Sequence, residues 1–229
     1  MSDSPAAVES HDLALRHHFA TQEQQRRAAS LGMWLFLSTE IMFFGGMFCA
    51  YLIYRRLYYT EFAAGSRSLD VTLGAVNTAV LICSSLTVAL GVRAAQMGKR
   101  KLLVVLMLLT LVFGVAFLGI KGVEWNSKFK EHHVPGASFH FEQTALDGKP
   151  IDPQHIQLYF SLYFAMTGMH ALHMIIGVGM FLYLTYHSWK GRYGPEYFTP
   201  VENGGLYWHF VDIVWIYLFP LLYLIDLKK

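Results

Sequence analysis

The chain has 229 residues, of which 54% are hydrophobic and only 15% are charged. Its mean hydropathy of +0.35 is typical of membrane proteins and excludes a large soluble domain within this length. The net charge is only +2, and no run of Lys and Arg is long enough for a nucleic-acid surface or a polybasic lipid-binding tail.

Residues 1–30 form a polar N-terminal tail. This segment has neither the apolar stretch nor the small-residue cleavage motif of a secretory signal peptide. We therefore expect no cleaved signal peptide at this end.

Five apolar segments follow, and each is long enough to cross a bilayer, which takes about 20 helical residues. They cover residues 31–54, 73–96, 102–120, 156–186 and 206–225. The sequence therefore predicts an all-α, integral membrane domain over residues 31–227, built as a bundle of five transmembrane helices. We expect the fourth segment to be one long helix that tilts or projects beyond the membrane.

The longest connection covers residues 121–155 and contains several prolines and glycines. It is too short and too polar for a separate domain, so we expect it to cap one membrane face. Proline is favoured at the first position of a helix, and Pro153 is therefore predicted to start the fourth helix.

Five spans place the two termini on opposite sides of the membrane. Basic residues are equally numerous on both faces, so a simple count does not orient the chain. The compact cluster of Lys99, Arg100 and Lys101 lies between two spans and favours the cytoplasm for that loop. This predicts a cytoplasmic N-terminus and a periplasmic C-terminus.

Both cysteines, Cys49 and Cys83, lie inside apolar segments. Buried free cysteines usually behave as small apolar residues. We expect neither a disulfide nor a metal site here.

Glu40 lies near the middle of the first span, where an ionisable group costs about 2.5–3.5 kcal/mol on insertion scales. Two interpretations remain open for it. It is either a protonated carboxyl that exchanges protons or supports assembly, or a structural hydrogen-bond donor between helices.

The fourth and fifth spans also carry polar side chains at a spacing of three residues. His170 and His173 share one helical face, as do His209 and Asp212. A desolvated imidazole and carboxylate satisfy each other best as a pair. We therefore expect His209 to pair with Asp212, and the helices that carry these groups to face one another or a partner subunit.

Two further interpretations concern single side chains. Imidazoles from opposing helices can ligate a haem, although a transmembrane histidine is more often a hydrogen-bonded packing residue.

Glu124, at the end of the third span, is interpreted as a solvated carboxylate near the headgroups.

Five stretches, taken together and in this order, resemble the successive signatures of cytochrome c oxidase subunit III. They are Ser38 to Phe44, Val76 to Leu81, Lys121 to Trp125, Thr167 to His173 and Trp208 to Trp215. The similarity extends from about residue 31 to residue 225.

The resemblance implies a seven-helix or a five-helix bundle, and this chain has the five-helix form. The family's lipid cleft is then complete only if a partner, such as subunit I, supplies two helices. Glu40 matches the family's intramembrane carboxylate, which reacts with carbodiimides. Trp208, Trp215 and Asn77 are expected to contact lipid or partner subunits.

The resemblance also implies a non-catalytic subunit with no metal and no redox cofactor of its own. Haems and copper belong to subunits I and II of an enzyme that reduces dioxygen to water with electrons from cytochrome c and pumps protons. Subunit III is implied to stabilise subunit I, to support proton uptake and lipid or oxygen access, and to bind phospholipid. The expected location is a bacterial cell inner membrane, in a larger respiratory supercomplex or outside one.

Four alternatives remain: a quinol oxidase subunit, the homologue associated with nitric oxide reductase, a membrane cytochrome with haem b between His170 or His173 and His209, and a proton-coupled transporter. The last is disfavoured because the sequence shows no inverted repeats.

Overall fold

The computed structural model describes residues 19–136, 139–141 and 151–225. Within these ranges the chain forms six α-helices. Their bounds are α2 Gln22–Leu57, α3 Tyr59–Arg67, α4 Val71–Gln96, α5 Arg100–Lys130, α6 Pro153–Trp189 and α7 Thr199–Tyr223. The predictions for residues 1–18, for the middle of the long connection and for the last residues lie outside the described part.

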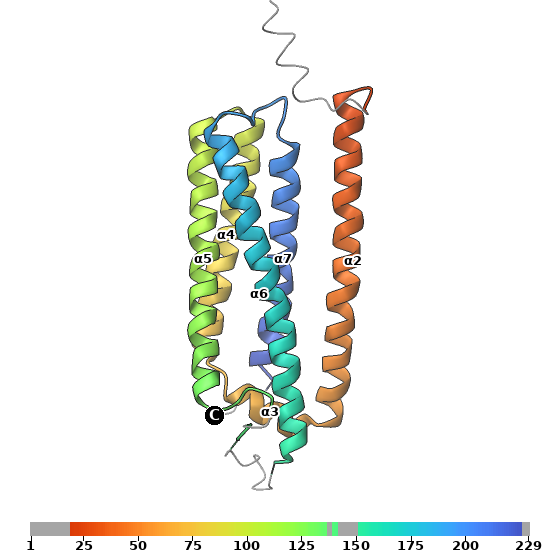
Figure 1. The fold of residues 1–229 in the computed structure, drawn as a ribbon, viewed down its shortest axis with the longest axis vertical. Coiled ribbons are helices and arrows are strands. Elements are labelled where there is room, and N and C mark those ends of the chain that lie inside the picture. The colour runs from red at the N-terminus through yellow and green to blue at the C-terminus, as the bar shows by residue number, and fades with distance from the viewer. Residues whose placement is uncertain (1–18, 137–138, 142–150, 226–229) are drawn as a thin grey trace, which may run out of the picture.

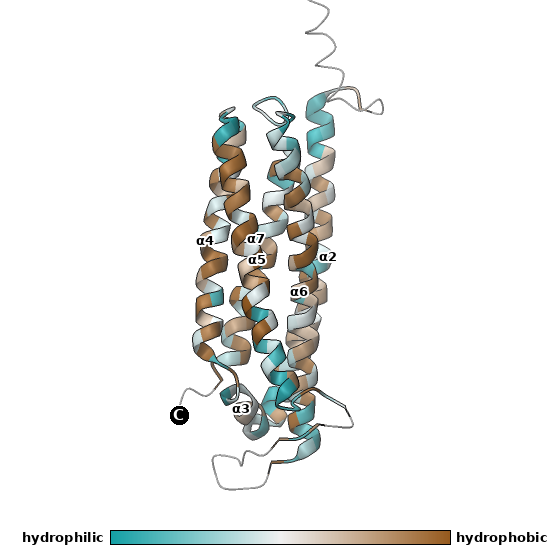
Figure 2. Ribbon diagram, turned by 60° about the vertical axis from the view of Figure 1, so that its left-hand side comes forward, coloured by the Kyte–Doolittle hydropathy of each residue, from teal (hydrophilic) through white to brown (hydrophobic). Residues whose placement is uncertain are grey.

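Five of the six helices in this part of the chain are long and apolar enough to cross a membrane. They are α2, α4, α5, α6 and α7, and they run side by side along the longest axis of the molecule (Figure 1). Hydrophobic residues cover their middle portions, and hydrophilic residues gather at both ends (Figure 2). This confirms the prediction of an all-α membrane bundle with five spans.

Local sequence signals start three of the helices. The Thr21 side chain accepts a hydrogen bond from a backbone N–H of the first turn of α2, and Asp70 does the same for α4. Asp152 caps α6, and Pro153 is its first residue. Such caps satisfy backbone N–H groups that have no partner inside the helix. The predicted start of the fourth helix at Pro153 is therefore confirmed.

The helices extend further than hydropathy predicts. α2 begins at Gln22, inside the expected tail, and α5 continues to Lys130, well into the expected loop. The short helix α3 was not predicted. Charged residues end an apolar pattern in sequence, but Lys121, Glu124 and Lys128 of α5 are buried by contacts with other parts of the fold.

The arrangement explains how the polar groups meet. α4 packs on α5 and α7, and α6 packs on α5 and α7. α2 lies along α7 and α6 at the edge of the bundle, and α3 lies at the end of the bundle where α2 ends and α6 begins (Figure 1). The first, fourth and fifth spans therefore pack together, as their polar residues predicted.

Close packing at the centre depends on one tryptophan and two glycines. The fully buried ring of Trp208 enters between α5 and α6. A Cβ added at Gly114 would lie 2.8 Å from this ring, and one at Gly177 would lie 3.0 Å from it. Small residues allow helices to approach closely in membranes. These two glycines make room for the indole.

Candidate functional site: polar side chains inside the bundle

Glu40 of α2 contacts His173 of α6. The distance from Glu40 Oε2 to His173 Nε2 is 3.1 Å, and His173 Nδ1 lies 2.8 Å from the backbone oxygen of Met169. Because a carbonyl oxygen only accepts, Nδ1 carries a hydrogen and Nε2 faces the carboxyl. This geometry suits a proton shared between carboxyl and imidazole, or a neutral hydrogen bond. Both interpretations of Glu40 therefore remain compatible with the fold.

His170 lies one turn from His173 but in a different environment. Its side chain is buried between the rings of Phe117 and Trp215, with centroid distances of 5.4 and 5.1 Å. Neither ring nitrogen has a hydrogen-bond partner among the described residues. His170 is therefore a packing residue of the aromatic core and does not join the Glu40–His173 pair.

The predicted pairing of His209 with Asp212 is wrong, because His209 bonds to a different residue. His209 Nδ1 lies 2.7 Å from the hydroxyl of Ser85 in α4. Asp212 is buried, and neither of its carboxyl oxygens has a hydrogen-bond partner among the described residues. The spacing of three residues put the two side chains on one face of α7, but only the fold shows that α4 presents a closer hydroxyl.

The prediction for Glu124 is also corrected. It is 4% exposed in side-chain surface and pairs with Lys121, which is 3% exposed, at 3.1 Å. Tyr163 and Tyr223 both donate to Glu124 Oε1, at 2.7 and 2.5 Å. Glu124 is therefore an interior ion-pair partner, not a solvated carboxylate at the membrane surface.

Lys121, Glu124, Tyr163 and Tyr223 form a closed group, which we call the Lys121 cluster. The lysine ammonium donates to Glu124, to Tyr163 OH at 3.0 Å and to Tyr223 OH at 2.6 Å. It also lies 5.1 Å from the ring centroid of Trp215, within the range of a cation–π contact. All three ammonium hydrogens thus have partners, and the cluster ties α5, α6 and α7 together.

Trp208, Trp215 and Asn77 lie in the interior, which contradicts their expected contact with lipid or partner subunits. All three are fully buried. Trp208 Nε1 donates to Ser84 at 3.0 Å, and Trp215 Nε1 donates to Thr78 at 3.1 Å. Hydroxyls from α4 satisfy the indole N–H groups inside the bundle, so the two tryptophans do not need a polar partner outside it.

The histidines do not fit a bis-histidine haem site. Both nitrogens of His173 have partners, His170 is enclosed by aromatic rings, and His209 is bonded to Ser85. No group of three or more His, Cys, Asp and Glu side chains is placed to hold a metal ion in the part of the chain that the structure describes. Cys49 and Cys83 are exposed free thiols.

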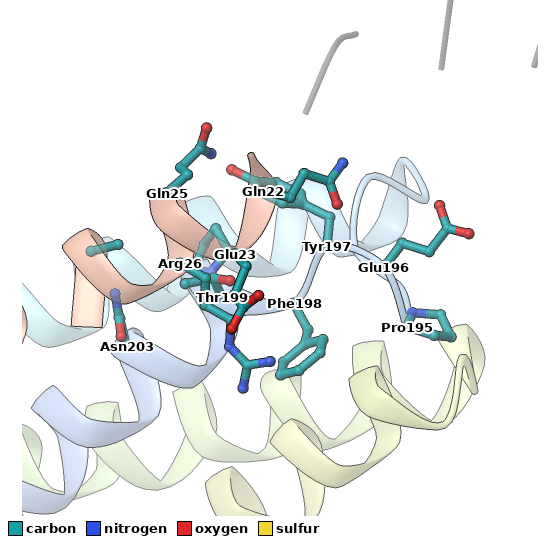
Figure 3. A pocket seen from close by; sticks show the side chains of 12 residues that line it. Gln22, Glu23, Gln25, Arg26, Pro195, Glu196, Tyr197, Phe198, Thr199 and Asn203 are labelled. Carbon is teal, nitrogen blue, oxygen red and sulfur yellow. The ribbon is translucent and has the colours of Figure 1, made fainter. Parts of the chain in front are cut away.

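Two of the hollows in the described part of the chain lie outside this interior. The first, of about 440 Å³, lies between the start of α2 and the segment that leads into α7 (Figure 3). Arg26 pairs there with Glu202 at 3.2 Å and stacks over Phe198 at 4.6 Å. The Arg26 cation in this hollow is therefore already paired with a carboxylate.

The second hollow is a groove of about 450 Å³ between α2 and α7. Its lining is almost entirely apolar and aromatic, and we call it the α2–α7 groove. His209 is the one titratable histidine or acid among the residues that line it. The groove therefore brings a polar nitrogen to an apolar surface of the bundle.

These features define an integral membrane helical bundle in which several of the intramembrane polar groups bind one another. Comparison with known proteins identifies the family. The sequence model of "Cytochrome c oxidase subunit III" matches residues 10–149 and 155–226, so the chain belongs to the cytochrome c oxidase subunit III family.

Individual relatives agree. The chain is 32% identical to a probable cytochrome c oxidase subunit 3 of Nocardia farcinica, over 86% of this chain and 87% of the relative. It is 31% identical to cytochrome c oxidase subunit 3 of Corynebacterium diphtheriae, over 96% and 99%. It is also 31% identical to the heme-copper oxidase subunit I+III of Aeropyrum pernix, over 84% of this chain and 22% of that longer protein.

Proposed function

We propose that this chain is the non-catalytic subunit III of a cytochrome c oxidase. In this proposal the complex reduces dioxygen to water and pumps protons, and partner subunits I and II hold the haems and copper. The family match over nearly the whole chain carries the proposal. The engaged or enclosed intramembrane histidines support it, because none is free in the geometry that a haem needs.

The proposed partners are subunits I and II and membrane phospholipid. The relative from Aeropyrum pernix, whose name joins subunits I and III, supports a direct association with subunit I. The bundle also leaves α2 largely exposed. In the most apolar stretch of α2 only 17% of the residues are buried, compared with 56% in the corresponding stretch of α7. The outer face of α2 therefore meets either lipid or another subunit.

We further propose that the N-terminus is cytoplasmic and the C-terminus periplasmic in a bacterial inner membrane. Five spans require opposite sides, and the basic cluster between α4 and α5 supports a cytoplasmic position for that loop. The role proposed for the subunit is to stabilise subunit I during turnover and to support proton uptake and lipid or oxygen access.

The test is to purify the chain from its native membrane in mild detergent and to identify what co-purifies. The proposal expects subunits I and II to co-purify, haem and copper spectra that leave with those subunits on dissociation, and oxidation of reduced cytochrome c by the complex. Oxidation of quinol but not of cytochrome c would assign the chain to a quinol oxidase. A haem spectrum that stays with the isolated chain would overturn the proposal.

A further inference from the structure

The α2–α7 groove has the size and length of a site for one extended ligand. Its volume of about 450 Å³ lies within the range of about 300–1,000 Å³ that small-molecule sites occupy. The lining residues of α2 extend from Trp34 to Phe48, which is about 21 Å along a helix axis. Gly45 lies between them, and the space at its Cβ position is open. These dimensions suit a ring that carries a long chain.

His209 presents one edge of its ring to this groove. Its Nδ1 lies 2.7 Å from the hydroxyl of Ser85 in α4. In the described part of the chain α4 packs on α5 and α7 but not on α2, so Nδ1 faces away from α2. The other ring nitrogen, Nε2, belongs to the opposite edge of the imidazole. Because the partly buried His209 also lines the groove, Nε2 is the nitrogen that a ligand there meets.

The depth of this nitrogen restricts the chemistry of the ligand. His209 lies near the middle of α7, about 15 Å from its first residue. Phospholipid headgroups stay outside the hydrocarbon core, which is about 30 Å thick. Only acyl chains reach the level of His209, and they have no hydrogen-bonding atom. A ligand that pairs with Nε2 therefore needs a polar group that can leave the headgroup layer inside an otherwise apolar molecule.

We propose that the α2–α7 groove binds an isoprenoid quinone, with a ring oxygen at His209 Nε2 and the chain along the apolar lining. The quinone and quinol forms both fit, since the Ser85 hydroxyl donates or accepts. When Ser85 donates to Nδ1, Nε2 carries the hydrogen and donates to a quinone carbonyl. When Nδ1 donates to Ser85, Nε2 accepts from a quinol hydroxyl. The exposed rings of Trp34 and Tyr217 offer aromatic contacts.

This binding site goes beyond the proposed function. It assigns a ligand to the groove and requires no electron transfer by this chain. Its test reads the position of a bound quinone and not the donor that the complex oxidises. A failed quinone site is therefore distinguishable from a failed assignment to an oxidase.

The experiment is photolabelling of the full chain in its native complex with an azido-substituted ubiquinone, followed by mass spectrometry of the peptides of this chain. Label is expected within residues 34–48 and 206–217. Decylubiquinone should compete with the label, and its half-maximal concentration measures the affinity. His209→Leu should raise this concentration about fivefold, the effect of one lost hydrogen bond. His209→Gln keeps a donor and should retain most of the affinity.

Gly45→Leu and Gly46→Leu are a matched pair of variants. Both glycines have open space at the Cβ position, but of the two only Gly45 lines the groove. Gly45→Leu fills the groove and should abolish labelling of both segments, whereas Gly46→Leu should leave it unchanged. Circular dichroism checks that each variant is folded. Should His209→Leu fail to fold, the glycine pair still decides.

Three results would overturn the proposal. The first is the absence of label from both segments in the complex, which would assign the groove to lipid tails or to a partner helix. The second is equal competition in wild type and His209→Leu, which would show that the groove holds only an apolar chain. The third is a Gly46→Leu variant that loses as much label as Gly45→Leu.

Discussion

The Lys121 cluster allows a quantitative test of how this bundle accommodates a charge pair in its interior. Removing one partner of a buried ion pair costs about 3–5 kcal/mol, because the remaining charge is left without compensation. The two partners are not equivalent here. In Lys121→Met, Tyr163 and Tyr223 still donate to the Glu124 carboxylate. In Glu124→Leu, the ammonium keeps only phenol oxygens and aromatic faces.

We therefore expect Glu124→Leu to lower the free energy of unfolding by the full amount, about 3–5 kcal/mol, and Lys121→Met to lower it by less. The double variant should recover more than half of the Glu124→Leu loss, because it removes both charges. For a chain of this size 1 kcal/mol corresponds to about 2–4 °C in melting temperature, so Glu124→Leu should melt about 6–20 °C lower. The measurement is thermal unfolding of the purified protein in one detergent, followed by circular dichroism.

Two results would refute this reasoning. One is a double variant that is as unstable as the sum of the two single variants, because its residues would then not interact. The other is a Lys121→Met variant that melts lower than Glu124→Leu. The second result would show that the phenol groups do not stabilise the remaining carboxylate.

Three further predictions concern other sites. Glu40→Gln should assemble normally but lose labelling by a lipid-soluble carbodiimide; persistent labelling would place the reactive carboxyl elsewhere. Gly65→Ala should destabilise the fold, since its Cβ would lie 2.3 Å from the Tyr159 ring, whereas Gly119→Ala, with open space around its Cβ, should change the melting temperature little. Burial and the nearby Lys128 charge lower the pKa of His133. The stability that the neutral imidazole contributes is therefore present above about pH 6.5 and is lost as the pH falls below that value, because the unfolded chain then binds a proton more readily than the folded one. His133→Phe should make the melting temperature less dependent on acid pH, and an unchanged pH dependence would contradict this prediction.

Hydropathy alone predicts the five spans, because a bilayer requires long apolar helices whatever their partners. It also identifies Glu40 and Asp212 as polar groups in unfavourable surroundings. It does not predict which side chains meet. His173 contacts Glu40, which is 133 residues away in sequence, and Ser85 of α4 contacts His209 of α7. These pairs therefore depend on how the helices pack.

The Lys121 cluster was missed for a related reason. Lys121 and Glu124 lie three residues apart, a spacing that favours an ion pair on a helix, and this signal was present in the sequence. Their charges instead suggested the end of a span. The two tyrosines that complete the cluster come from α6 and α7, and no local pattern connects them with α5.

The position of α2 at the edge of the bundle has a consequence for biosynthesis. Its contacts with other spans are with α6 and α7, which are the last of the described spans to be made, although α2 is the first of them. During translation α2 must therefore remain in the bilayer as a separate helix, held by its own apolar residues. Until α6 is inserted, the Glu40 side chain lies in the bilayer without its partner His173, which is energetically unfavourable. The insertion of α6 then supplies this partner and favours the packing of α2 onto the bundle.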